Sequence, residues 1–152
     1  TMLEEGQSMF AYPFKGYWRD VGTIQSLWEA NMDLINDPES VDLNDPQWRI
    51  YTNTNDVPPQ YIGPNASVKK SLIADGCRVY GTVRNTVLSH KVQIGEGSVV
   101  EDSVIMPNVK IGENVVIKKA MIAEGAVIED NAIIKDENDE ISVVSEFELV
   151  KA

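Results

Sequence analysis

The sequence contains little cysteine and histidine and has no long hydrophobic run. Its single cysteine, Cys77, excludes an internal disulfide, which favours a reducing compartment. No apolar stretch approaches the roughly 20 residues that a transmembrane helix needs, so we expect no membrane partner. The chain starts at Thr1 without a charged and then apolar leader, and we expect it to be part of a longer protein. Together these absences predict a soluble, cytoplasmic protein.

Local excess positive charge is also missing. The net charge is −11, and residues 1–60 carry 3 basic and 10 acidic side chains. Residues 61–134 carry 8 of each kind, and residues 135–152 carry 2 basic and 6 acidic ones. Binding to nucleic acid requires a basic patch or stripe, and no segment supplies one. We therefore expect no nucleic-acid partner.

The second half of the sequence consists of a repeat. Five segments align, which are "IGPNASVKKSLI" from Ile62, "VYGTVRNTVL" from Val79, "IGEGSVVEDSVI" from Ile94, "IGENVVIKKAMI" from Ile111 and "IEDNAIIKD" from Ile128. Their spacings are 17, 15, 17 and 17 residues. In each copy a large aliphatic residue recurs about every six positions, and a smaller residue comes two positions before it. Because two is the period of a β-strand, both side chains are expected to face the same interior.

These aliphatic residues form three columns, so each copy is expected to have three sides. The columns are Ile62/Val79/Ile94/Ile111/Ile128, Val68/Val83/Val100/Ile117/Ile134 and Ile73/Leu88/Ile105/Ile122. The pattern predicts a triangular parallel β-solenoid and not an amphipathic helix. Cys77 falls in an inward column, as a small buried hydrophobe. A charged column, Lys69-Lys70, Arg84, Glu101-Asp102 and Lys118-Lys119, is interpreted as a solvated face with opposite signs on two adjacent rungs.

The two ends of the repeat carry different signals. The charge density of "KDENDE", from Lys135 to Glu140, argues against a further strand, and Ser145 and Glu148 have capping-box spacing. We therefore predict a short C-terminal helix within residues 136–152. Residues 37–61 are rich in Pro, Asn and Asp and predict an extended linker.

The N-terminal part predicts a strand, a turn and a helix. "YPFKGYW" is interpreted as the strand, "RDVG" as the turn and "TIQSLWEANMDLI" as a helix capped by Thr23, with Trp28 packed beneath it. The apolar face of such a helix needs a partner surface, which we expect on a missing upstream domain. Asp20 would lie at the carboxyl end of the strand, where it could hold a cation. The alternative is a turn carboxylate that accepts hydrogen bonds from nearby backbone N–H groups.

The segment "GYWRDVGTIQSLWEANMDL", followed by "WRIYT", "PPQYI" and the hexapeptide coils, resembles the C-terminal part of bacterial glucose-1-phosphate adenylyltransferases. The resemblance covers residues 12–134. It implies a mainly β fold, a left-handed parallel β-helix over residues 62–135, preceded in residues 1–36 by a strand-helix remnant of an α/β nucleotidyltransferase domain.

What the resemblance implies about function is specific. The family joins ATP to glucose 1-phosphate, releasing pyrophosphate and giving ADP-glucose for glycogen synthesis. By resemblance, Asp20 is a ligand of the catalytic Mg²⁺, and Trp18 lines the sugar-phosphate side of the pocket. The β-helix is expected to support a homotetramer and allosteric regulation. The family's glycine-rich nucleotide loop has no counterpart here, so we expect this chain to be inactive alone.

Three alternatives stay open at this point. A hexapeptide-repeat acyltransferase would use His90, the single histidine, as a general base, although we interpret it as a surface residue at a coil corner. A pure assembly module would use the flat faces of the solenoid as its interface. Other sugar nucleotidyltransferases with a β-helix tail would share the same architecture.

Overall fold

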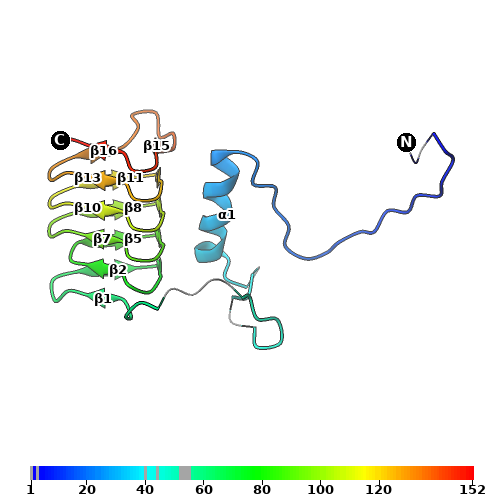
Figure 1. The fold of residues 1–152 in the computed structure, drawn as a ribbon, viewed down its shortest axis with the longest axis horizontal. Helices are drawn as coiled ribbons and strands as arrows, with labels where there is room; N and C mark the ends of the chain where they lie inside the picture. Colours follow the sequence, from blue (N-terminus) through cyan, green and yellow to red (C-terminus); the bar gives the residue numbers. More distant parts are fainter. Residues whose placement is uncertain (1, 3, 40, 44, 52–55) are drawn as a thin grey trace.

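The computed structural model describes residues 2, 4–39, 41–43, 45–51 and 56–152. Within this part of the chain, the strands stack into a solenoid, and the helix α1 (Ile24–Asn36) lies along one of its sides (Figure 1). The segment before α1 extends away from the solenoid toward the N-terminus (Figure 1). No helix of the described residues is long and apolar enough to cross a membrane.

The solenoid has three parallel sheets, one for each side of a coil. Sheet A contains β1 (Tyr61–Ile62), β4 (Arg78–Val79), β7 (Gln93–Ile94), β10 (Lys110–Ile111), β13 (Val127–Ile128) and β16 (Leu149–Val150). Sheet B contains β2 (Ser67–Lys69), β5 (Thr82–Arg84), β8 (Val99–Glu101), β11 (Val116–Lys118) and β14 (Ile133–Ile134). Sheet C contains β3 (Leu72–Ile73), β6 (Val87–Leu88), β9 (Val104–Ile105), β12 (Ala120–Ile122) and β15 (Ser142–Val144).

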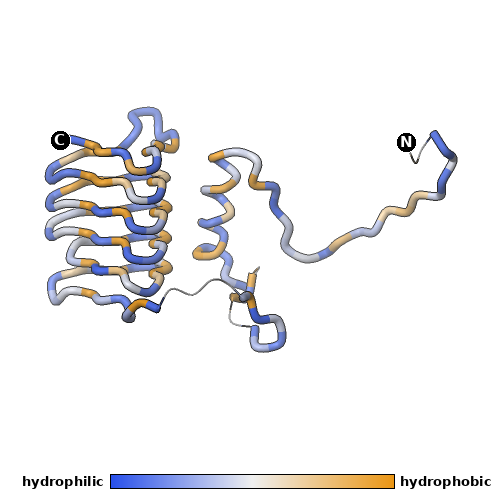
Figure 2. The backbone as a smooth tube through the Cα atoms, viewed as in Figure 1, coloured by the Kyte–Doolittle hydropathy of each residue, from blue (hydrophilic) through white to orange (hydrophobic). Residues whose placement is uncertain are grey.

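The strand register confirms the aliphatic columns. Val79 pairs with Ile94, and Ile94 pairs with Ile111, so large side chains stack directly on one another inside the solenoid. Most of them are fully buried, and Figure 2 shows hydrophobic positions recurring in successive coils. The short second copy keeps this register, because Val68 pairs with Val83. The predicted parallel β-solenoid is therefore confirmed, and its left-handed sense stays a prediction from the resemblance.

Tight corners between the sheets require residues with a left-handed backbone. Positive φ angles recur in register at three corners, where glycine, asparagine, aspartate and lysine predominate. Glycine and asparagine adopt this conformation at low cost, which explains their regular occurrence in the repeat. One such corner column contains Lys70, Asn85, Asp102 and Lys119.

The charged column follows this same edge of the solenoid. The Arg84 Nη1 atom lies 2.6 Å from Glu101 Oε1 on the adjacent rung, which confirms the predicted pairing of opposite signs. Cys77 is 1% exposed, as its inward column predicted, and burial raises the pKa of its thiol.

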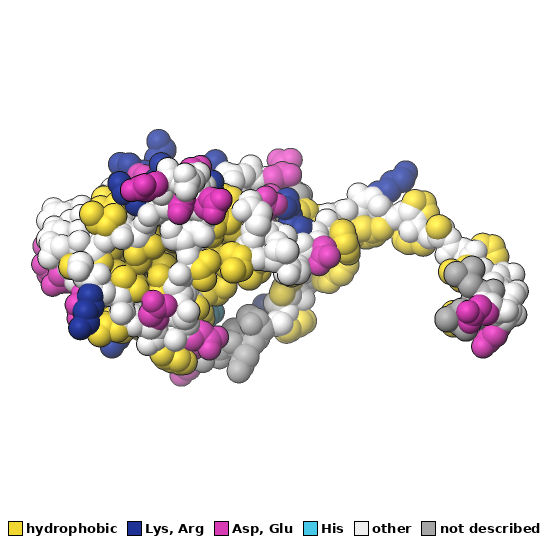
Figure 3. Space-filling view, turned by 90° about the horizontal axis from the view of Figure 1, so that it is seen from above, with side chains coloured by type: hydrophobic (Ala, Val, Ile, Leu, Met, Phe, Trp, Pro, Cys, Tyr) yellow, Lys and Arg dark blue, Asp and Glu magenta, His cyan; other side chains and the backbone are white. Residues whose placement is uncertain are grey.

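The predicted C-terminal helix is wrong. Residues 141–152 contain β15 and β16, which extend the solenoid beyond the predicted boundary at residue 135. The acidic "KDENDE" segment is a loop between β14 and β15. The Ser145 N–H does donate to Glu148 Oε2 at 2.7 Å, but this bond closes a turn in which Phe147 has a φ of 54°. Figure 3 looks onto this end and shows charged side chains around hydrophobic ones.

The predicted N-terminal strand is also absent. Among the described residues before α1, none lies in a strand, and the stretch from Tyr12 to Trp18 is exposed. A strand needs neighbours that pair with its backbone N–H and C=O groups, and the described chain places none beside this segment.

The predicted helix is confirmed, but the prediction that its apolar face packs on an upstream domain is wrong. Thr23 caps α1 in a capping box with Ser26. The apolar face of α1 packs on the outer surface of sheet C, where Met32 is 4% exposed and contacts a cluster that includes Val104 and Met121. The Trp28 indole Nε1 donates to the backbone oxygen of Asp102 at 2.8 Å. The solenoid thus supplies the surface that was expected on an upstream domain.

Candidate functional site

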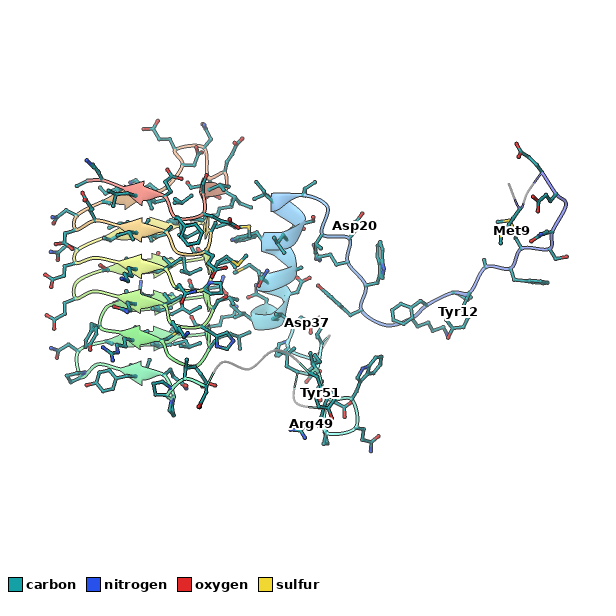
Figure 4. The ribbon with its side chains drawn as sticks, in the orientation of Figure 1. Met9, Tyr12, Asp20, Asp37, Arg49 and Tyr51 are labelled. Atoms are coloured by element: carbon teal, nitrogen blue, oxygen red, sulfur yellow. The ribbon has the colours of Figure 1, made fainter. Side chains whose placement is uncertain are left out.

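The two residues of the predicted site lie just before α1. Trp18 is 76% exposed, and Asp20 is exposed as well. Figure 4 places Asp20 beside the start of α1, on the side that faces away from the solenoid. Both side chains are therefore available to a ligand or to another part of a larger protein.

The backbone geometry around Asp20 matches the turn alternative. Asp20 Oδ1 accepts a hydrogen bond from the backbone N–H of Gly22 at 3.2 Å, which is an Asx turn. Among the described residues, no group of three or more His, Cys, Asp or Glu side chains could hold a metal ion. Mg²⁺ is commonly held by only one or two carboxylates together with substrate phosphates, so a single exposed Asp20 fits the role of one ligand.

Next to this site lies a charged network that the sequence analysis missed. The guanidinium of Arg19 bridges two carboxylates of α1, with Nη1 2.5 Å from Glu29 Oε2 and Nη2 2.7 Å from Asp33 Oδ2. The Tyr17 hydroxyl donates to the same Asp33 oxygen at 2.9 Å. Glu29 and Asp33 are four residues apart and so share one side of the helix. This four-residue spacing of two acidic side chains, with a basic residue shortly before the helix, was the sequence signal for the network.

The network favours the charged form of the Glu29 carboxylate and the protonated form of the Tyr17 phenol. Hydrogen bonds from Gln25 and then from Arg19 lower the pKa of Glu29. Partial desolvation raises the pKa of Tyr17, and its hydrogen bond to Asp33 raises it further. At neutral pH, Tyr17 therefore remains a donor and Glu29 remains an anion, which is the state that Arg19 requires.

A hollow borders the same segment. It has a volume of about 420 Å³ and lies between residues 14–17 and residues 41–50. Its lining includes the aromatic side chains of Phe14, Tyr17 and Trp48. Trp48 is 80% exposed, so the hollow is open and its aromatic walls are only partly covered.

His90, the candidate base of the acyltransferase alternative, lies at the turn between β6 and β7. Its position at a coil corner agrees with the prediction, and its side chain is half-buried. Its Nδ1 atom is buried and has no hydrogen-bond partner among the described residues. Among the described residues, no hydrogen bond links the His90 Nδ1 atom to Trp18 or Asp20, which precede α1.

Two family models match the chain. The model described as "GlmU-like, C-terminal hexapeptide" matches residues 60–147, and the model described as "Nucleotidyl transferase" matches residues 1–37. The first match coincides with the solenoid. The second contains Trp18, Arg19, Asp20 and the whole of α1.

Curated relatives are similar over most of the chain. A glucose-1-phosphate adenylyltransferase of Clostridioides difficile is 67% identical over 150 residues, which is 99% of this chain and 39% of the relative. Proteins of the same name from Desulforamulus reducens and Bacillus thuringiensis are 59% and 55% identical over 69% and 70% of this chain. The chain thus spans between about a quarter and two fifths of the length of these relatives. Because the hexapeptide model alone matches more than half of its residues, the chain belongs to the family of GlmU-like C-terminal hexapeptide proteins.

Proposed function

We propose that this chain is the C-terminal part of a cytoplasmic glucose-1-phosphate adenylyltransferase, which joins ATP to glucose 1-phosphate and releases pyrophosphate. Two matches together carry the proposal. The nucleotidyl transferase model matches residues 1–37, and a relative with this enzyme name is 67% identical over 150 residues. The remaining active-site residues would belong to the upstream part of such an enzyme.

In this role, Trp18 and Asp20 contribute to a site that two parts of the enzyme share. The exposed Asp20 carboxylate would hold Mg²⁺, and its Asx turn with Gly22 fixes the direction of the carboxylate. Mg²⁺ supplies positive charge that stabilises the α-phosphate and the leaving pyrophosphate. The exposed ring of Trp18 offers an apolar wall on the sugar-phosphate side of the pocket.

The solenoid is proposed to serve assembly into a homotetramer and regulation. Several of its outward-facing aliphatic side chains are exposed, among them Ile133 at 64% and Val143 at 52%. A second copy covering these residues would remove apolar surface from water.

The test is a chimaera that joins the upstream part of the Clostridioides difficile relative to this 152-residue chain. We expect Mg²⁺-dependent formation of ADP-glucose by the chimaera and no turnover by the 152-residue chain alone. Asp20→Asn should lower kcat/KM about 100-fold, because it removes a metal ligand. The control Asp75→Asn, at a solenoid corner, should leave kcat/KM unchanged. A folded chimaera that forms no ADP-glucose would contradict the proposal, and sedimentation of the same proteins would show whether they form tetramers.

A further inference from the structure

The extended segment before α1 has two faces. In an extended backbone, neighbouring side chains tend to point to opposite sides, and the contacts of Tyr17, Trp18 and Arg19 differ in this way. Tyr17 and Arg19 both contact carboxylates of α1. Trp18, in contrast, is 76% exposed, compared with 37% for Tyr17. The contacts of Tyr17 and Arg19 with α1 therefore determine the position and direction of Trp18 and Asp20.

The helix that receives these contacts is itself fixed on the solenoid. Trp28 donates to the Asp102 backbone oxygen at 2.8 Å, and Met32 is 4% exposed against sheet C. Asp102 is held in turn, because Asn85 Nδ2 donates to its Oδ1 at 2.7 Å.

On α1, the residues that contact the solenoid lie next to the residues that contact the extended segment. Trp28 and Met32 are four residues apart and face the solenoid, and Glu29 and Asp33 follow them by one residue each. One residue is a rotation of about 100° around a helix, so the acidic pair faces the extended segment while the apolar pair faces sheet C. A short rigid path thus runs from the solenoid through α1 to Arg19.

We propose that Arg19 is a positioning residue that orients Trp18 and Asp20 relative to the solenoid-bound helix. Its guanidinium is the group that bridges two carboxylates on successive turns of α1, which fixes both the distance and the rotation of the segment. Partly exposed ion pairs of this kind add little to global stability, so we expect the effect on local order. The geometry of this chain supports the orienting role of Arg19, and an effect of Arg19 on catalysis rests on the proposed function.

The first test uses NMR relaxation of the 152-residue chain. In the wild type, we expect backbone order parameters near ~0.85 for residues 17–22, and Arg19→Met should lower them below ~0.6 while residues 27–35 of α1 stay rigid. Arg19→Lys keeps one ion pair and should restore part of the order. The control Lys15→Met removes a charge from the same segment and should leave the order parameters unchanged. Order parameters that stay near the wild-type value in Arg19→Met would overturn the proposal.

The second test uses the chimaera with glucose 1-phosphate, ATP and Mg²⁺. Arg19→Met should raise the KM for glucose 1-phosphate and the Mg²⁺ concentration for half-maximal rate, with a loss in kcat/KM of about tenfold or more. The Tm should stay within about 2 °C of the wild type, and Arg19→Lys should recover part of kcat/KM. Equal losses in Lys15→Met and Arg19→Met would contradict a positioning role. If the wild-type chimaera makes no ADP-glucose, the proposed function fails, and the order parameters alone decide the role of Arg19.

Discussion

At the scale of single residues, buried hydroxyl groups connect neighbouring coils. Ser98 and Ser103 are both 0% exposed. Ser103 Oγ donates to the Glu101 backbone oxygen at 2.6 Å and accepts from the Ala120 N–H at 3.0 Å. Ser98 Oγ similarly donates to the Gly112 oxygen and accepts from the Val115 N–H. Backbone groups at strand ends and corners can lack a partner in the regular strand ladders, and the inward hydroxyls supply one.

The Ser103→Ala variant tests this role. Alanine fits the position, because Ala120 occupies the same column one coil further on and is fully buried. The substitution therefore leaves packing intact but deprives the buried Ala120 N–H of its acceptor, which should lower the free energy of unfolding by about 1–3 kcal/mol. Chemical denaturation measures the change. The control Ser67→Ala, on the exposed face of β2, should change it by less than about 0.5 kcal/mol, and equal effects would contradict the hydrogen-bonding role.

At the scale of elements, the sequence predicted what repeats and missed what depends on distant partners. The columns of the repeat could be predicted because each coil carries the same strand period. The strand β15 could not, since the charged loop before it interrupts the spacing and the Ser145 and Glu148 pair suits either a helix cap or a turn. The N-terminal strand was predicted from local sequence, and a strand without neighbours does not form.

The site was predictable to a similar extent. The roles of Trp18 and of Asp20 as a metal ligand were predicted from the family resemblance, whereas local sequence alone raised the turn alternative for Asp20, which the hydrogen bond from Gly22 matches. The role of Arg19 was harder to predict. The spacing of Glu29 and Asp33 places two carboxylates on one side of α1, but their contact with Arg19 depends on how the extended segment folds back along the helix.

The sequence also could not predict which residues of α1 contact which rung of sheet C. Trp28 contacts the rung of Asp102, and Met32 Sδ lies 3.9 Å from Asn85 Nδ2 on the adjacent rung. Four helical residues rise about 6 Å, and neighbouring rungs are about 4.8 Å apart, so one helical turn advances by about one coil. A helix that runs along the solenoid axis can therefore repeat similar contacts on successive coils.

The Met32→Ala variant tests the contact between α1 and the solenoid. Met32 is 4% exposed, and truncation of a buried methionine typically costs about 2–5 kcal/mol. An isolated helix of 13 residues is marginal in water, so a weakened contact should allow α1 to unfold locally. Amide hydrogen exchange should become faster throughout α1 and remain unchanged in β7 and β10. The control Leu34→Ala lies two residues along the same helix at a partly exposed position, and exchange as fast as in Met32→Ala would contradict the prediction.

At the scale of the whole molecule, the solenoid is a stack of coils in which each coil is buried mainly by its neighbours. Stability in such a stack depends on its terminal coils, since an uncovered coil exposes both its aliphatic interior and its unpaired strand edges. At the C-terminal end, β15 pairs with β12 and β16 pairs with β13. Val144 is 5% exposed and packs in the main core. Residues 141–152 thus cover the preceding coil and continue its interior.

Truncation after Glu140 tests this capping role. It removes β15 and β16, uncovers the interior side chains Ile122 and Ile128, and leaves the edges of β12 and β13 unpaired. We expect the Tm to fall by about 5 °C or more and the truncated protein to associate, because an open parallel edge can pair with another chain. Thermal unfolding and sedimentation velocity measure the two effects. As the matched control, deletion of residues 1–11 removes a similar number of residues, of which residues 2 and 4–11 are exposed, and should change the Tm by less than about 1 °C. If the truncated protein kept the Tm and the sedimentation coefficient of the full chain, the capping role would be contradicted. A terminal coil, unlike a loose appendage, cannot be lost without exposing the coil beneath it.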